Sequence, residues 1–226
     1  RRQVERVVKT RELHRKARAK VPYPIVALVG YTNAGKSTLF NRLTGAEVLA
    51  QDQLFATLDP TMRQMVLPGG RRVILSDTVG FISDLPHELV AAFRATLEEV
   101  LAADLILHVR DIAHPETEAQ AGDVEKILAE LGVDEDVPLF EVWNKIDLLP
   151  PEQGEALRTR DARTPEVFAV SALTGEGIGA LVAGIARALE GARHEGEVFV
   201  PYADGRARAF LHAGRMVVSE QAEEEG

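Results

Sequence analysis

The sequence predicts an α/β fold with a six-stranded, mostly parallel sheet, one antiparallel edge strand and helices on both faces. Three observations predict it. Short apolar runs alternate along the chain with amphipathic stretches of helical period, as in successive β-α-β units. The apolar run at residues 25–29 leads directly into G-Y-T-N-A-G-K-S at residues 30–37, and a helical stretch follows. Finally, residues 63–67 and 72–77 flank Pro-Gly-Gly, a spacing typical of an antiparallel hairpin.

These patterns assign the elements in order. A charged helix is expected at residues 2–19, because the proline-containing segment that follows it at 21–24 disfavours helix. The expected strands, each a short apolar run, are 25–29, 63–67, 72–77, 105–109, 139–143 and 167–170. The expected helices are 38–43, 85–102, 116–131, 152–158 and 178–189. Beyond residue 191 we expect two short strands, 198–200 and 216–218, and a helix at 206–212.

The composition is that of an ordinary globular protein, with 46% hydrophobic and 27% charged residues. No apolar run approaches the length of about 18 residues that a membrane span needs. Without cysteine the chain can form neither a disulfide nor a thiolate metal site, which fits a cytoplasmic location. We expect a cytoplasmic monomer that inserts into no membrane and binds no DNA. Because the chain starts without Met, we also expect a fragment of a longer protein.

Charge is distributed unevenly along the chain. Residues 1–20 contain nine Arg or Lys and two Glu, a net charge of 9 − 2 = +7, whereas the whole chain carries −9, which leaves −16 for the remainder. A basic arm on an acidic body could contact RNA phosphates. On charge alone, a solvated connecting helix is the favoured alternative.

The motif at residues 30–37 predicts a site for a nucleoside triphosphate, because it follows a strand and begins a helix. Its glycines permit the dihedrals of a phosphate-binding loop, and the helix N-terminus adds partial positive charge. Lys36 would reach the β- and γ-phosphates, and the Ser37 hydroxyl would ligate Mg²⁺. The residues assigned to phosphate binding are Gly30, Tyr31, Thr32, Asn33, Ala34, Gly35, Lys36, Ser37 and Thr38.

Two further segments complete the predicted phosphate end. Asp77-Thr78-Val79-Gly80 follows a strand, so its carboxylate could hold Mg²⁺ through water and the Gly80 N–H could touch the γ-phosphate. A threonine hydroxyl in the irregular stretch 46–61, from Thr57 or Thr61, would complete the Mg²⁺ shell only while the γ-phosphate is present. The residues assigned to the site from that stretch are Phe55, Ala56, Thr57, Leu58 and Asp59.

A base-recognition motif follows the strand expected at 139–143. It is Asn144-Lys145-Ile146-Asp147, in which Asp147 could accept from N1–H and the 2-amino group of guanine while Asn144 supports the base edge. Adenine offers no such pair of donors and would leave the carboxylate unpaired. After the next strand, the backbone N–H of Ala172 in Ser171-Ala172-Leu173 could donate to guanine O6. The three motifs in this order, each at a strand end, predict a guanine-nucleotide site.

Together these motifs resemble those of the translation-factor class of GTPases, and three longer segments are similar to the HflX family of ribosome-associated GTPases. The segments are GYTNAGKSTLFN, FATLDPT and DTVGFISDLPHELVAAFRATLEEV, and the resemblance covers about residues 10–192. It implies a Ras-like P-loop GTPase domain, or G domain, at 21–192. It also implies that residues 1–20 end a basic helical linker from a missing N-terminal domain, and that 193–226 form a small or partial C-terminal domain.

The resemblance also implies a chemistry and a partner. Members of the family bind GTP and GDP with Mg²⁺ and associate with the 50S ribosomal subunit and its rRNA, and some of them split ribosomes. The family pattern favours Thr57 over Thr61, so the implied Mg²⁺ ligands are Ser37, Thr57 and Asp77. The residues implied to take part in hydrolysis are Lys36, Thr57 and Gly80.

Phe81 makes slow intrinsic hydrolysis the expectation. It follows Gly80, where many small GTPases have the glutamine that orients the attacking water, and an apolar ring cannot do that. A partner or a cation must then complete the site. Asn33 matches the asparagine that helps to hold K⁺ in K⁺-activated GTPases; alternatively, it only tolerates the turn. The alternative function is a guanine-nucleotide-binding module with negligible hydrolysis, whereas the guanine-reading motif disfavours an ATPase or phosphotransferase.

Overall fold

A computed structural model describes most of the chain in two separate units. In the first, Arg1–Ala192, the described residues are 23–46, 61–78, 80–81, 99–134, 136–161 and 164–190. In the second, Arg193–Gly226, they are 198, 200–201, 204–213, 217 and 220. No helix among these residues is long and apolar enough to cross a membrane.

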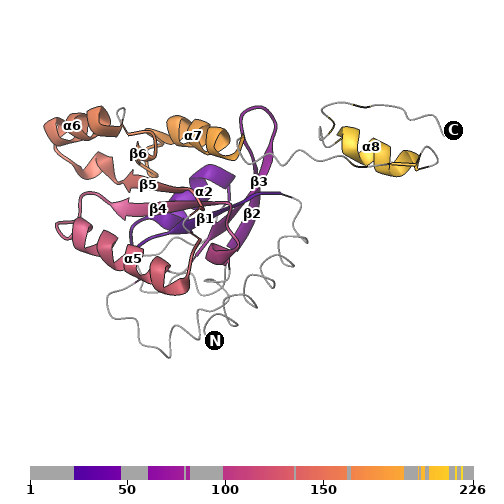
Figure 1. Cartoon of the computed structure of the whole chain (residues 1–226). Coiled ribbons are helices and arrows are strands. Elements are labelled where there is room, and N and C mark those ends of the chain that lie inside the picture. Colours follow the sequence, from indigo (N-terminus) through magenta and orange to yellow (C-terminus); the bar gives the residue numbers. More distant parts are fainter. Residues whose placement is uncertain are drawn as a thin grey trace, which may run out of the picture. The chain divides into compact units, whose positions relative to one another are not determined.

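The first unit is built on a six-stranded sheet, as the sequence predicts (Figure 1). Its strands are β1 (Ile25–Val29), β2 (Thr61–Val66), β3 (Arg72–Asp77), β4 (Leu105–Asp111), β5 (Leu139–Asn144) and β6 (Val167–Ala169). Their order across the sheet is β2-β3-β1-β4-β5-β6, and every pair is parallel except the hairpin β2–β3. This confirms the predicted antiparallel edge strand, and it places the long crossovers between parallel neighbours.

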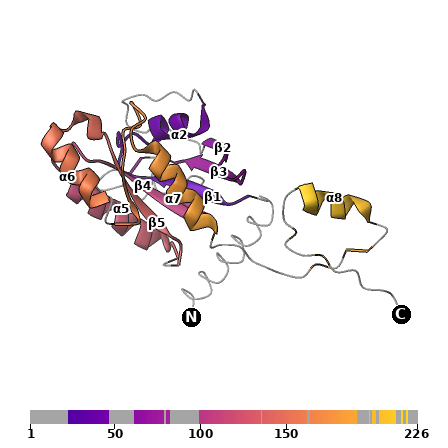
Figure 2. The same cartoon turned by 90° about the horizontal axis from the view of Figure 1, so that it is seen from above.

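Helices cover both faces of the sheet (Figures 1 and 2). They are α2 (Lys36–Thr44), α5 (Thr117–Leu131), the short 3-10 helix η1 (Ile146–Leu148), α6 (Pro151–Asp161) and α7 (Ile178–Glu190). One hydrophobic cluster joins the sheet to α2 and α7 through Leu39, Phe40 and Leu181. The other joins the opposite face to α5 through Val124 and Leu128. The central strands are therefore buried from both sides, which is why β1 reads as an uninterrupted apolar run.

Most predicted boundaries hold to within two residues, and β4 is the informative difference. The expected strand ended at residue 109, whereas β4 continues to Asp111 because Arg110 and Asp111 pair with Trp143 and Asn144 of β5. Of the helix expected at 85–102, only residues 99–102 are described; residues 99–101 are helical and residue 102 is in a turn. Of the expected irregular stretch 46–61, residues 47–60 lie outside the described residues, as does the basic segment 1–20, and Thr61 is the first residue of β2.

Polar side chains are buried on the face of β4 and β5 that α5 covers. Arg110 is ion-paired at 2.7 Å with Glu141 of β5 and at 2.7 Å with Glu118 of α5. The Trp143 indole N–H donates to the same Glu141 carboxylate at 2.7 Å. His108 is buried on the same face; burial and, secondarily, the neighbouring Arg110 charge lower its pKa to about 4, so the ring is neutral at neutral pH. Pairing with two carboxylates thus explains how a charged arginine is accommodated in this buried strand.

The second unit contains the predicted helix, α8 (Gly205–Ala213). Within this unit Arg208 forms an ion pair with Glu220 at 2.8 Å. The described residues of the two expected strands, Val198, Val200 and Val217, are not in strands. Runs of three residues cannot form a stable sheet without a partner surface, so apolar β-branched residues alone were a weak signal here.

Candidate nucleotide-binding site

The phosphate loop joins β1 to α2 in a conformation that few residues permit. Gly30 has φ +153°, and a Cβ on it would lie 2.2 Å from the Val109 carbonyl oxygen of β4. Gly35 has φ +93°, and its Cβ would lie 2.3 Å from Nδ2 of Asn144. Asn33, at φ 59°, is a non-glycine residue in the left-handed region, which asparagine tolerates better than most. Both glycines are therefore required by close approach as well as by backbone geometry.

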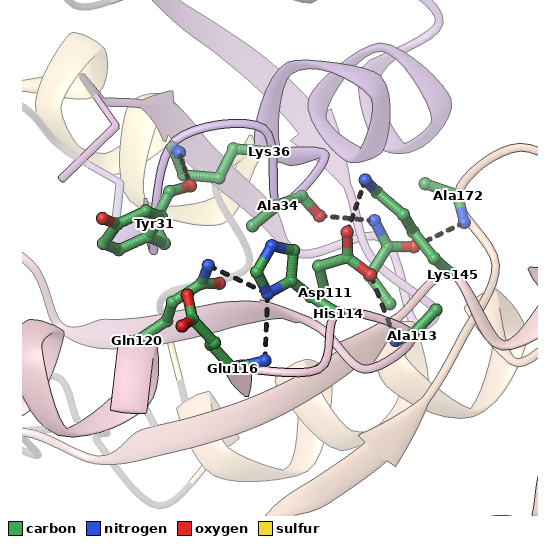
Figure 3. Close-up of polar contacts among 11 residues, drawn as sticks. Tyr31, Ala34, Lys36, Asp111, Ala113, His114, Glu116, Gln120, Lys145 and Ala172 are labelled. Carbon is green, nitrogen blue, oxygen red and sulfur yellow. Dashed lines mark hydrogen bonds and ion pairs between the residues drawn. The ribbon is translucent and has the colours of Figure 1, made fainter. Parts of the chain in front are cut away.

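Lys36, the first residue of α2, is buried and points back into the loop. Its Nζ donates to the Gly30 carbonyl at 3.1 Å and to the Tyr31 carbonyl at 2.9 Å; Figure 3 shows the second contact. Burial lowers the Lys36 pKa to about 8 because desolvation penalises the ammonium, and the Asp77 carboxylate partly opposes this. The loop thus holds an amine that would gain a counter-charge from a bound phosphate.

Two of the three side chains predicted to hold Mg²⁺, Ser37 and Asp77, lie together at the carboxyl end of β3. The Ser37 hydroxyl donates to Oδ2 of Asp77 at 2.7 Å, and Asp77 is fully buried. The adjacent Thr78 hydroxyl donates to the Leu28 carbonyl at 2.6 Å, which anchors the chain beyond the strand. A hydroxyl beside a carboxylate is a hard-oxygen donor set, which suits Mg²⁺. No cluster of three or more His, Cys, Asp or Glu among the described residues could hold a metal, so Mg²⁺ would depend on phosphate oxygens and water as well.

The segment after Asp77 lies against the phosphate loop. A Cβ on Gly80 would be 2.8 Å from the Thr32 Cα and 3.1 Å from the Lys36 Nζ, so no side chain fits there. Thr32 N–H donates to the Phe81 carbonyl at 2.7 Å, and Phe81 N–H donates to the Gly30 carbonyl at 3.1 Å. The Phe81 ring is buried among the apolar residues on the α5 face of the sheet. The predicted γ-phosphate sensor and the phosphate loop are therefore neighbours.

Asn144, the last residue of β5, joins three parts of the site. Its Nδ2 donates to the Ala34 carbonyl of the phosphate loop at 2.9 Å, and its Oδ1 accepts from the Ala172 N–H at 2.9 Å. The sequence predicts that Asn144 supports the base edge, but it does not predict this bridge. The Ala172 N–H, predicted to donate to guanine O6, already donates to Asn144 Oδ1, so it would have to share its hydrogen between Asn144 and the base.

Lys145 and Asp111 form a second contact beneath the base-recognition motif. Lys145 has φ 68°, and its Nζ lies 2.7 Å from Oδ2 of Asp111 at the end of β4. The other Asp111 oxygen accepts from Ala113 N–H at 3.1 Å, and Figure 3 shows both contacts. Asp147, the predicted guanine acceptor, is exposed in η1. Sequence reasoning missed Asp111. Asp77 was found because it is a carboxylate at the end of a strand, and the same rule would have found Asp111 if the expected strand had extended to residue 111.

The loop after β6 is tightly closed by its own polar groups. Ser171 is buried, and its hydroxyl accepts from the Thr174 N–H at 3.0 Å. Ala172 is buried beside it, whereas the Leu173 side chain is 69% exposed. The predicted residues that lie outside the described parts of the chain are Phe55, Ala56, Thr57, Leu58, Asp59 and Val79. The remaining predicted residues lie at the carboxyl edge of the sheet, in the loops that leave it, in the first turn of α2 or in η1.

Comparison with known proteins identifies the family. The family model described as "50S ribosome-binding GTPase" matches residues 25–145. The protein named GTPase HflX of Magnetococcus marinus is 52% identical over 216 residues, which cover 96% of this chain and 49% of that protein. GTPase HflX of Escherichia coli is 44% identical over 223 residues, which cover 99% of this chain and 52% of that protein. The chain thus spans about half the length of the curated relatives it matches.

Solved structures share this fold. A GTP-binding protein of the archaeon Sulfolobus solfataricus, in complex with GDP, superposes with a TM-score of 0.60 at 27% identity, covering 85% of this chain and 58% of that one. Era of Aquifex aeolicus, bound to GDP and aluminium fluoride, has a TM-score of 0.58 at 26% identity, covering 80% of this chain and 60% of that one. Taken with the loop, the strand-end carboxylate and the base motif, the family model and the HflX relatives show that the chain belongs to the HflX family of GTPases.

Proposed function

We propose that this chain is the nucleotide-binding part of a cytoplasmic switch protein that binds and hydrolyses GTP and associates with the large ribosomal subunit. The observation that carries the proposal is the joint placement of three groups: the Lys36 amine, the Ser37–Asp77 oxygen pair and the Asn144 bridge. All three lie where the phosphate loop meets the carboxyl edge of the sheet, the edge at which ligands bind in open α/β folds. Residues 21–192 are the proposed G domain, and the division of the chain at Ala192 supports that limit.

Each part of GTP has a proposed partner in this chain. Backbone N–H groups of residues 30–38 and the Lys36 amine bind the phosphates. Mg²⁺, held by Ser37, Asp77 and Thr57, would neutralise charge on the β- and γ-phosphates. Asp147 accepts from the guanine N1–H and 2-amino group, and its exposure in η1 leaves the carboxylate accessible to a base.

Hydrolysis is proposed to be slow until a partner acts. Phe81 is buried, and its backbone is paired with the phosphate loop, so this residue offers no polar group to orient water. The ribosome is the proposed activator, and K⁺ held near Asn33 is a second one. Association with ribosomal RNA is supported by the family description and by the solved complex of Era with Mg²⁺, a GTP analogue and part of 16S ribosomal RNA. Splitting of ribosomes is the role that the family resemblance suggests.

The proposal is tested by GTP turnover of residues 1–226 in KCl, alone and with added 50S subunits, with GTP binding measured in parallel. Stimulation by 50S subunits supports a ribosome-coupled GTPase. Binding without stimulated turnover would favour the second candidate, a guanine-nucleotide-binding module. Turnover is also measured in NaCl, and equal rates in KCl and NaCl would show that K⁺ does not activate hydrolysis.

A further inference from the structure

Arg42 crosses from the phosphate-loop helix to the loop at the base end of the site. It lies in the last turn of α2, about one and a half turns beyond Lys36 and Ser37. Its Nε donates to the Ala172 carbonyl at 3.0 Å, and its Nη2 donates to the Leu173 carbonyl. The guanidinium therefore binds two successive carbonyls of the loop with two of its own N–H groups, which fixes direction as well as distance.

Among the described residues, the contacts that hold this loop from outside are those of Arg42 and Asn144 and the packing of Ala172 in the hydrophobic cluster shared with α2 and α7. The Ser171–Thr174 bond and the Gly175 N–H, which donates to the Ser171 carbonyl at 2.8 Å, close the loop on itself but do not attach it to the rest of the domain. Leu173 is 69% exposed and so contributes little packing. Asn144 holds the N–H side of Ala172, and Arg42 holds the carbonyl side. A Cβ on Gly175 would lie 3.9 Å from the Arg42 Cζ, so the turn also packs against the guanidinium.

We propose that Arg42 is a positioning residue for base selectivity: it ties the Ala172–Leu173 backbone to the helix that begins at the phosphates. The inference rests on the proposed guanine-nucleotide function, because the Ala172 N–H is the predicted donor to the 6-oxo group. Since α2 begins with Lys36 and carries Arg42 near its other end, one rigid element sets the separation between the phosphate and base contacts. Arg42 itself touches neither.

The test compares two nucleotides that differ at the 6-oxo group. Affinities of residues 1–226 for GDP and for 2-aminopurine riboside diphosphate are measured by calorimetry for the wild type and for Arg42→Ala. The second nucleotide lacks that oxygen and also the N1 proton, but the missing N1–H affects the wild type and the variant alike, so each nucleotide is compared between the two proteins. We expect GDP to bind about tenfold more weakly to Arg42→Ala, as for loss of one well-placed hydrogen bond, with the 2-aminopurine nucleotide changed less than about twofold. Arg42→Lys keeps the charge but lacks the fork of donors, so its GDP affinity should lie between those of the wild type and Arg42→Ala.

Controls separate positioning from folding and from the proposed function. Arg72→Ala removes an exposed arginine of β3 and should change neither affinity. Amide hydrogen exchange at residues 171–175 should be faster in Arg42→Ala than in the wild type, with or without nucleotide. Equal weakening of both nucleotides, or an unchanged preference for GDP, would overturn the inference. A wild type that does not prefer GDP would instead refute guanine reading; faster exchange in the variant would then still support a positioning role for Arg42, and unchanged exchange would refute that too.

Discussion

Lys36 shows how a single buried side chain can couple ligand binding to protonation. Its ammonium is surrounded by the loop and held by two carbonyls, and the cost of desolvation lowers its pKa to about 8. Above pH 8 the amine is therefore mostly neutral in the nucleotide-free protein. A bound phosphate favours the charged form and raises the pKa again. The protein must then take up a proton as it binds the nucleotide.

We predict that GDP binding takes up close to one proton at pH 9 and almost none at pH 7, where Lys36 is already charged. Calorimetry in buffers of different ionisation enthalpy measures the uptake directly. Lys36→Met, which cannot titrate, should bind GDP more weakly and show no uptake at pH 9. Proton uptake that persists in the methionine variant would assign the titration to another group.

Asp147 is a second case in which a single residue is expected to decide a property of the site, because its carboxylate is proposed to read the base. Asp147→Asn replaces the acceptor by an amide that can donate to the 2-oxo group of xanthine. We predict that preference shifts from GDP to XDP, with GDP weakened by at least about tenfold as a charged hydrogen-bond pair is lost. Competition binding with both nucleotides measures the shift, and Asp136→Asn, a change in the loop before β5, serves as the control. Unchanged GDP affinity would contradict the base-reading role.

At the scale of whole elements, α7 is placed by a close approach to β6. Gly184 lies in the middle of this helix, and a Cβ there would be 2.3 Å from the Cζ of Phe168. Phe168 is itself buried and packs on Phe140, with ring centroids 5.2 Å apart. The helix can approach the sheet this closely because position 184 has no side chain, and an added Cβ would press on a ring already packed in the core.

A matched pair of glycine substitutions tests this packing. Gly184→Ala should lower the free energy of unfolding by about 1–3 kcal/mol, because overpacking outweighs the gain in helix propensity. Gly122→Ala lies in the exposed face of α5 with nothing within 4 Å of its Cβ, and it should raise stability by about 0.5–1 kcal/mol. Urea denaturation measures both. Stabilisation by both changes would show that Phe168 can move aside.

At the scale of the whole molecule, the described nucleotide site belongs to one of two units. Every described residue assigned to nucleotide binding lies between Gly30 and Leu173, within the unit that ends at Ala192. The second unit contributes α8 and its own ion pair. Nucleotide binding should therefore not depend on residues 193–226.

We predict that a chain ending at Ala192 binds GDP within about twofold of the affinity of residues 1–226, because no described contact to the site is removed. Fluorescence titration with a labelled nucleotide measures this, and the thermal midpoint shows whether the shortened chain is folded. A large loss of affinity in a folded chain would mean that the second unit takes part in the site.

Much of this molecule could be predicted from local sequence. The phosphate loop, the strand-end positions of Asp77 and Asn144 and the six strands follow from patterns a few residues long, and local dihedrals and hydrophobic periodicity suffice to set them. The described residues of the two final expected strands, Val198, Val200 and Val217, are not in strands, since three apolar residues do not determine a sheet partner. A short apolar run shows that its residues favour strand, but it does not determine whether they pair with another strand.

The tertiary structure decided which polar groups meet across the sheet. The parallel register of β4 and β5 sets Asp111 beside Asn144, and that register brings Asp111 to Lys145. The contact of Arg42 with Ala172 spans 130 residues, and the Asn144 contact with Ala34 spans 110. The sequence by itself determined that a phosphate loop and a base-reading motif are present, since each is encoded in adjacent residues. How one is held against the other depends on strand register and helix packing, which arise only when distant segments bury their apolar surfaces together.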